Sequence, residues 1–93
     1  MNIITAEEAR NISNNYIPEK IINAFNFVML KIEEKASNGY NHIILYEEDI
    51  EKEVFNQITS ELFKNIMRKY GYKVKKELRE YYSSFYYKIT ISW

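Results

Sequence analysis

The sequence contains no cysteine, one proline, two glycines and one histidine among its 93 residues. Without cysteine the chain has no disulfide scaffold, no thiol nucleophile and no Cys-ligated zinc site. Proline and glycine are too scarce for a flexible linker between domains. We therefore expect a single domain spanning residues 1–93, large enough for one modest hydrophobic core.

Long apolar segments are also missing. The uncharged run from Ile21 to Leu30 has ten residues and includes Asn23 and Asn26. A membrane-spanning helix needs about 20 apolar residues. The first eight residues have neither the basic start nor the apolar stretch of a signal peptide. We therefore expect a cytoplasmic protein without a membrane partner.

Groups for nucleophilic or metal-assisted catalysis are scarce. The chain holds a single histidine, His42, and a single aspartate, Asp49. A nucleophile needs a base and an orienting group within reach, and a zinc site needs several ligands. We expect the imidazole of His42 to be hydrogen-bonded to backbone at the edge of a strand. The sequence thus predicts no enzyme activity, no catalytic residue, no metal site and no cofactor.

Hydrophobic residues make up 46% of the chain, and their spacing predicts helices in its first half. Thr5 and Glu8 have the spacing of a capping box, which predicts a short helix over about residues 6–13. A second helix is expected from Pro18 to Gly39, where glycine suits the left-handed cap. Apolar residues recur every three or four positions and predict a wide buried face on this helix: Ile21, Ile22, Phe25, Val28, Met29, Ile32 and Ala36.

The middle of the chain predicts a strand followed by a helix. The apolar run over residues 42–46 is typical of a central, largely buried strand. Three acidic residues, 47–49, are expected to begin the helix, where the helix dipole favours negative charge. We expect this helix to continue to Gly71, with its apolar residues on one buried face: Ile50, Val54, Phe55, Ile58, Leu62, Phe63, Ile66, Met67 and Tyr70.

The last third of the chain alternates apolar and polar residues. This pattern predicts strands over residues 72–79 and 85–93, joined by a turn near residues 81–84. The predicted element order is α-α-β-α-β-β. It defines an α+β fold of two layers, in which helices pack on a small three-stranded sheet that ends in a C-terminal antiparallel hairpin.

Acidic residues cluster where the third helix is expected to begin. Five carboxylates lie within seven residues: Glu47, Glu48, Asp49, Glu51 and Glu53. The plain interpretation is a solvated helix start, stabilised by the dipole. The alternative is an acidic surface that imitates nucleic-acid phosphates and occupies a basic groove on another protein.

The neutral net charge conceals a basic C-terminal third. Residues 64–93 hold eight bases and two acids, whereas residues 38–63 hold one base and six acids. Basic groups among aromatic rings suit single-stranded nucleic acid, because phosphates attract cations and bases stack on rings. Lys73, Lys75, Tyr82 and Tyr86 are the candidate contacts for nucleic acid or a nucleotide. The plain alternative is a charged strand edge that prevents aggregation.

The chain is rich in tyrosine, with nine tyrosines and one tryptophan. Tyrosine and tryptophan are enriched at protein interfaces. Exposed tyrosines on the outer face of the hairpin would serve either a partner protein or a homo-oligomer contact. The plain alternative is that their hydroxyl groups reach solvent over rings packed on the fold.

Four segments resemble small accessory proteins of tailed phages from low-GC bacteria. They are Ile4–Arg10, the amphipathic helix ending at Gly39, Gly71–Val74 and Tyr87–Trp93. The resemblance lies in pattern, size and composition, and it carries no catalytic signature. It implies a protein that binds and blocks a host protein or defence system, as anti-CRISPR proteins do.

We therefore expect a non-enzymatic protein of the host cytoplasm that binds and inhibits a host protein or nucleoprotein complex. Its contacts would come from the acidic cluster at Glu47–Glu53 or from the Tyr- and Lys-rich hairpin. The alternatives are a nucleic-acid or nucleotide-binding module that uses the hairpin, and a virion or assembly component.

Overall fold

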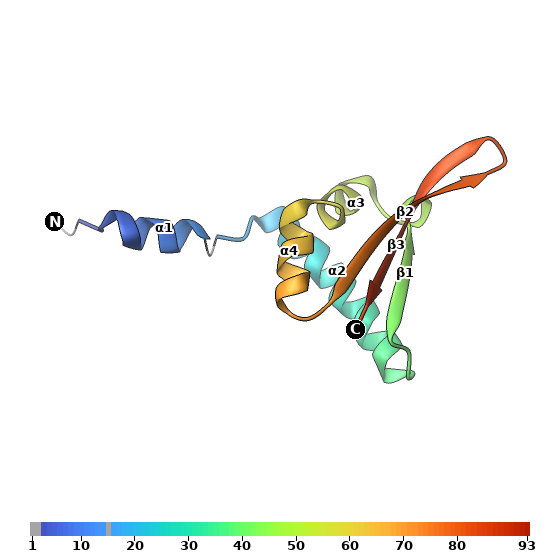
Figure 1. Cartoon of the computed structure of the whole chain (residues 1–93), viewed down its shortest axis with the longest axis horizontal. Helices are drawn as coiled ribbons and strands as arrows, with labels where there is room; N and C mark the ends of the chain where they lie inside the picture. Colours follow the sequence, from blue (N-terminus) through green and yellow to red (C-terminus); the bar gives the residue numbers. More distant parts are fainter. Residues whose placement is uncertain (1–2, 15) are drawn as a thin grey trace.

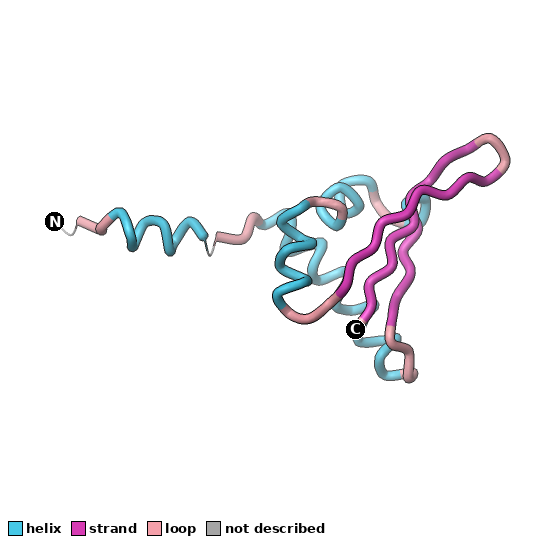
Figure 2. Tube along the Cα trace, in the orientation of Figure 1, coloured by secondary structure: helices cyan, strands magenta, loops and turns pink. Residues whose placement is uncertain are grey.

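The computed structural model describes residues 3–14 and 16–93. Helices α2, α3 and α4 cover one face of a three-stranded sheet, while α1 projects away from this body (Figures 1 and 2). The α+β class, the order α-α-β-α-β-β and the C-terminal hairpin are confirmed. The elements are α1 (Ala6–Asn14), α2 (Glu19–Ser37), β1 (His42–Tyr46), the 3₁₀ helix η1 (Glu47–Asp49), α3 (Lys52–Ile58), α4 (Glu61–Lys69), β2 (Lys73–Tyr81) and β3 (Ser84–Ser92).

The strand order in the sheet is β1-β3-β2, with both neighbouring pairs antiparallel. The prediction that residues 42–46 form the central strand is wrong, because β3 lies in the middle and β1 forms an edge. The hairpin pairs β2 with β3, and β1 joins the free edge of β3 rather than that of β2. Ile89 and Ile91 of β3 are buried, whereas Ile44 of β1 faces outward and is 39% exposed.

The single helix predicted over residues 47–71 is divided into η1, α3 and α4. The break falls at Thr59 and Ser60, whose side chains bond to backbone. The hydroxyl of Thr59 donates to the Phe55 carbonyl at 3.0 Å, and the hydroxyl oxygen of Ser60 accepts from the Phe63 N–H at 3.2 Å. Serine is a favoured N-cap, so Ser60 begins a new helix. Gly71 follows that helix with φ +91°, as expected.

The core lies between the helices and the inner face of the sheet. Its buried residues come from α2, α3, α4, β1 and β3: Ile21, Ala24, Val28, Ile32, Ile43, Leu45, Phe55, Ile58, Phe63, Met67, Ile89 and Ile91. The rings of Phe25 and Phe63 stack with centroids 4.5 Å apart and join α2 to α4. The buried face predicted for α2 is narrower than expected, because Ile22 and Met29 are 43% and 36% exposed.

The predicted start of the first helix and the predicted end of the second are confirmed, whereas α2 begins one residue later than expected, at Glu19, with Pro18 in an extended conformation before it. The Glu8 N–H donates to the Thr5 hydroxyl oxygen at 3.1 Å, as in a capping box. Gly39 follows α2 with φ +84°, a conformation that glycine adopts without steric cost. Within residues 3–14 and 16–93, no helix has the length and apolar character needed to cross a membrane.

Candidate functional site

The β2–β3 hairpin extends beyond the third strand of the sheet. β2 and β3 pair from Lys73↔Ser92 to Tyr81↔Ser84, whereas β1 ends opposite Lys88. Past that point the hairpin is a two-stranded ribbon that projects from the body (Figure 1). It exposes four large side chains, by 56–83% of their surface. We call them the hairpin tip: Leu78, Tyr81, Tyr82 and Phe85.

The turn of the hairpin holds an aromatic residue in an unfavourable backbone conformation. Tyr82 has φ +49° and is the only non-glycine residue with positive φ within the described part of the chain. A left-handed conformation costs an L-residue with a Cβ about 1–2 kcal/mol. Tyr81 lies edge-on to Tyr82, with ring centroids 4.5 Å apart. Strained residues of this kind concentrate at functional sites, so Tyr82 marks the turn as a site candidate.

Glu47 anchors the base of the projecting ribbon. Its carboxylate accepts a hydrogen bond from the Tyr87 N–H at 3.1 Å, next to the last pair between β1 and β3, Tyr46↔Lys88. The Tyr87 ring stacks on Phe55, with centroids 6.3 Å apart, and the Lys76 ammonium lies 4.1 Å from its centre. The ribbon is therefore held to the body at Tyr87, and the part beyond the Leu78–Tyr87 pair projects from it (Figure 1).

We expect Glu47→Ala to lower the free energy of unfolding by about 1–2 kcal/mol, because a buried or half-buried amide loses a charged acceptor. Urea unfolding measures this change, and hydrogen exchange should show faster exchange at Tyr87. Glu47→Gln keeps an acceptor oxygen and should lose less. The exposed neighbour variant Glu48→Ala should stay within about 0.5 kcal/mol of the wild type. Equal stability of Glu47→Ala and Glu48→Ala would contradict the anchoring role.

The structure brings four of the predicted contact residues together in one hollow. Glu47, Glu48, Tyr82 and Tyr86 line one hollow of about 640 Å³ between η1 and the ribbon. Its remaining lining residues are Tyr81, Ser84 and Phe85. The hollow thus joins two carboxylates to the aromatic side chains of the hairpin, which are about forty positions away in the sequence.

The other predicted acidic residues lie elsewhere. Asp49 borders a separate depression between α2 and β1. Glu51 and Glu53 flank the start of α3, where Glu53 pairs with Lys20 at 3.5 Å. Asp49, Glu51 and Glu53 therefore do not line the hollow that Glu47 and Glu48 line.

Lys73 and Lys75 lie on the face of the sheet that no helix covers. The register places Lys75 beside Thr90 and Ile44, and Glu77 beside Lys88 and Tyr46. Directly paired residues share a face, and the opposite face carries the core residues. We call this surface the open sheet face: His42, Ile44, Tyr46, Lys73, Lys75, Glu77, Arg79, Tyr86, Lys88 and Thr90.

The charge of the open sheet face is positive and only partly compensated. Glu77 pairs with Arg79 at 2.9 Å and with Lys75 at 3.8 Å. Lys73 and Lys88 add two further cations. Tyr46 and Tyr86 contact each other edge to face, with centroids 6.1 Å apart. Cations and aromatic rings therefore share one exposed surface.

The side chain of His42 contacts a neighbouring side chain. Its Nδ1 lies 3.0 Å from the side-chain oxygen of Asn41, whereas the sequence predicted a backbone partner. No group of three or more His, Cys, Asp or Glu side chains suited to a metal ion occurs in the parts of the chain that the structure describes.

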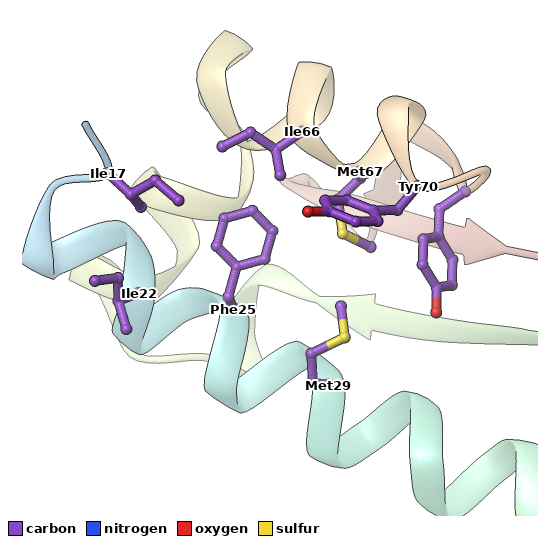
Figure 3. A pocket seen from close by; sticks show the side chains of 8 residues that line it. Ile17, Ile22, Phe25, Met29, Ile66, Met67 and Tyr70 are labelled. Carbon is purple, nitrogen blue, oxygen red and sulfur yellow. The ribbon is translucent and has the colours of Figure 1, made fainter. Parts of the chain in front are cut away.

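An apolar groove between α2 and α4 was missed by the sequence analysis. Figure 3 shows Phe25 and Met29 of α2 facing Ile66 and Tyr70 across it. The groove has a volume of about 490 Å³. The complete lining is Ile17, Ile22, Phe25, Met29, Ile66, Met67, Tyr70 and Tyr72. The wide apolar face of α2 could have indicated this groove, because that helix carries more apolar residues than the core buries.

No protein-family model, curated protein or solved structure matches this chain. The fold and the surfaces define a small α+β domain with a projecting aromatic hairpin.

Proposed function

We propose that this protein is a non-enzymatic binding protein whose hairpin tip inserts into an apolar cleft of a partner protein. The carrying observation is that Leu78, Tyr81, Tyr82 and Phe85 are exposed together on a ribbon that projects beyond the sheet. By the strand register Leu78 and Phe85 lie on one side of the ribbon and Tyr81 on the other, so the apolar side chains surround its end. Clustered exposed apolar side chains mark interaction sites. The ribbon is narrow, so it suits a concave partner surface.

The chemistry of the tip supports a protein partner. Burying a large apolar side chain contributes about 1.5–3 kcal/mol, and tyrosine is frequent among the residues that dominate binding energy. Glu47 and Glu48 line the hollow beside the tip. They favour a partner with Lys or Arg around its cleft, because complementary charge directs association and register.

The resemblance to small phage accessory proteins supports a partner that belongs to the host cell. We propose that it is a host protein or nucleoprotein complex and that occupation of its cleft by the hairpin inhibits it. Inhibition would follow from simple blockage of the cleft, which requires no catalytic group on this chain.

A second candidate function is binding of single-stranded nucleic acid on the open sheet face. The observation that favours it is the placement of Lys73, Lys75 and Lys88 on the same face as Tyr46 and Tyr86. Such a surface can neutralise phosphates and stack bases at once. The tip is not required for this function, so the two candidates use different residues.

Capture from a lysate of a low-GC bacterium, with and without nuclease, tests both candidates. We expect one protein to be retained at near-equal stoichiometry after nuclease treatment. The matched control is Lys75→Glu/Lys88→Glu, which reverses charge on the open sheet face and should retain the same protein. Loss of the captured protein on nuclease treatment, or in this control, would favour the nucleic-acid function. Binding of an oligonucleotide that weakens steeply with salt would then establish it.

A further inference from the structure

We infer that α1 of one copy of this chain docks in the apolar groove between α2 and α4 of a second copy, forming a symmetric dimer by exchange of helices. The inference is independent of the proposed function, because the groove and the hairpin tip are separate surfaces. Four observations support it: the groove is open, α1 packs on no other element in the described part of the chain (Figure 1), the connection directs α1 away from α2, and the first turn of α1 and the last turn of α4 carry opposite charges.

The groove is open in the isolated chain. Phe25 and Met67 form its floor, and the more exposed Ile22, Met29 and Tyr70 form its sides. Figure 3 shows these side chains directed into the same space from the two helices. The volume, about 490 Å³, is lined almost wholly by apolar side chains, so water is a poor occupant.

Helix α1 needs a surface to pack on. It has nine residues, and isolated helices shorter than about 12–15 residues are marginal in water. The buried core begins only at Ile21. Ala6, Ala9 and Ile12 fall on one side of α1 by helical spacing, and Ile12 is 63% exposed. Small residues beside one large apolar residue allow close approach to a groove.

The connection between α1 and α2 favours a second copy over the groove of the same chain. The Tyr16 N–H donates to the Ser13 carbonyl at 3.2 Å, a short-range contact at the end of α1. Pro18 has ψ 143°, and a residue before proline, here Ile17, is restricted to extended conformations. The extended backbone at Pro18 carries the chain away from the axis of α2 rather than back along it (Figure 1). Figure 1 accordingly shows α1 directed away from its own body.

The charges of the two elements are complementary. The first turn of α1 carries Glu7 and Glu8. The last turn of α4, the helix that lines the groove with Ile66 and Met67, carries Arg68 and Lys69. A helix lying in the groove with its N-terminus toward the last turn of α4 brings the acidic turn to the basic turn. Each copy has one α1 and one groove. In a dimer with two-fold symmetry each groove therefore holds the α1 of the other copy, and no groove is left to bind a third copy.

The absence of cysteine makes a cross-linking test direct. Two single variants, Ala9→Cys on α1 and Ile66→Cys in the groove, are mixed and treated with a short bis-maleimide. We expect a covalent product containing one chain of each variant. Asn11→Cys, on the opposite side of α1 by helical spacing, is the matched control and should give much less of this product with Ile66→Cys.

The mass of the unmodified chain in solution gives a second readout. Light scattering should show a dimer for the wild type and a monomer for Ile12→Glu and for Ile22→Glu, two exposed positions where the monomer fold should persist in circular dichroism. A wild-type monomer at all concentrations would overturn the inference. A double variant Ala9→Cys/Ile66→Cys that cross-links only within one chain would also overturn it, because α1 would then close on its own groove. Capture of a partner by the hairpin tip would be unaffected by either result.

Discussion

Replacement of Tyr81, Tyr82 and Phe85 by serine is expected to lower the affinity for the captured partner by about 100-fold or more. These three side chains supply most of the aromatic surface of the tip, and each is at least 63% exposed in the free protein. Truncation of one interface residue of the dominant kind costs about 2 kcal/mol or more. Calorimetry or a surface-based binding assay with the purified partner measures the loss.

The fold should survive this change, because the tip lies beyond the anchored part of the ribbon. Circular dichroism and the midpoint of thermal unfolding check this point. The matched controls are Leu30→Ser on α2 and Tyr40→Ser before β1, which remove exposed apolar side chains away from the hairpin. They should bind as the wild type does. If the triple variant bound with unchanged affinity, the hairpin tip would not be part of the interface.

Phe63→Ala is expected to lower the free energy of unfolding by about 3–5 kcal/mol, the usual cost of truncating a buried phenylalanine. Phe63 has no exposed surface, and its ring stacks on Phe25 at 4.5 Å. The variant therefore leaves a cavity where α2 and α4 meet. Because small domains have only about 5–15 kcal/mol of total stability, a large fraction of the variant should unfold at low urea concentration.

Phe85→Ala is the matched control for this prediction. The residue type and the substitution are the same, but Phe85 is 64% exposed. Its loss should change stability by no more than about 0.5 kcal/mol. Urea unfolding of the two variants under identical conditions distinguishes the effect of burial from the effect of the residue type. Similar destabilisation by both would contradict the position of Phe63 at the centre of the core.

Local features of the fold were predictable where short-range interactions decide them. The N-cap at Thr5 and the C-terminal cap at Gly39 depend on residues a few positions apart, and both are confirmed. The alternation over residues 72–93 predicts the hairpin, because strands close in sequence pair readily. The helix break at Thr59 and Ser60 was missed because the apolar spacing continues through it, and two side-chain hydrogen bonds outweigh that continuity.

Non-local features were predicted less well. The apolar run of β1 suggested a central strand, yet β1 is an edge, since strand order depends on which of the two free edges of the hairpin β1 joins, and that choice is not local. Ile22 and Met29 suggested burial by their spacing, yet they line an open groove. Periodicity shows which residues share a face, but it does not show whether another element covers that face.

The candidate site illustrates the same division. The sequence by itself determined the class of the fold, the order of its elements and the composition of the two contact candidates, because these follow from local spacing and residue chemistry. Only the tertiary structure decided that Glu47 and Glu48 meet Tyr82 and Tyr86 in one hollow while Glu51 and Glu53 lie apart from it. The physical reason is that η1 turns the chain after β1, and the pairing of β3 with β1 brings the base of the hairpin to that turn.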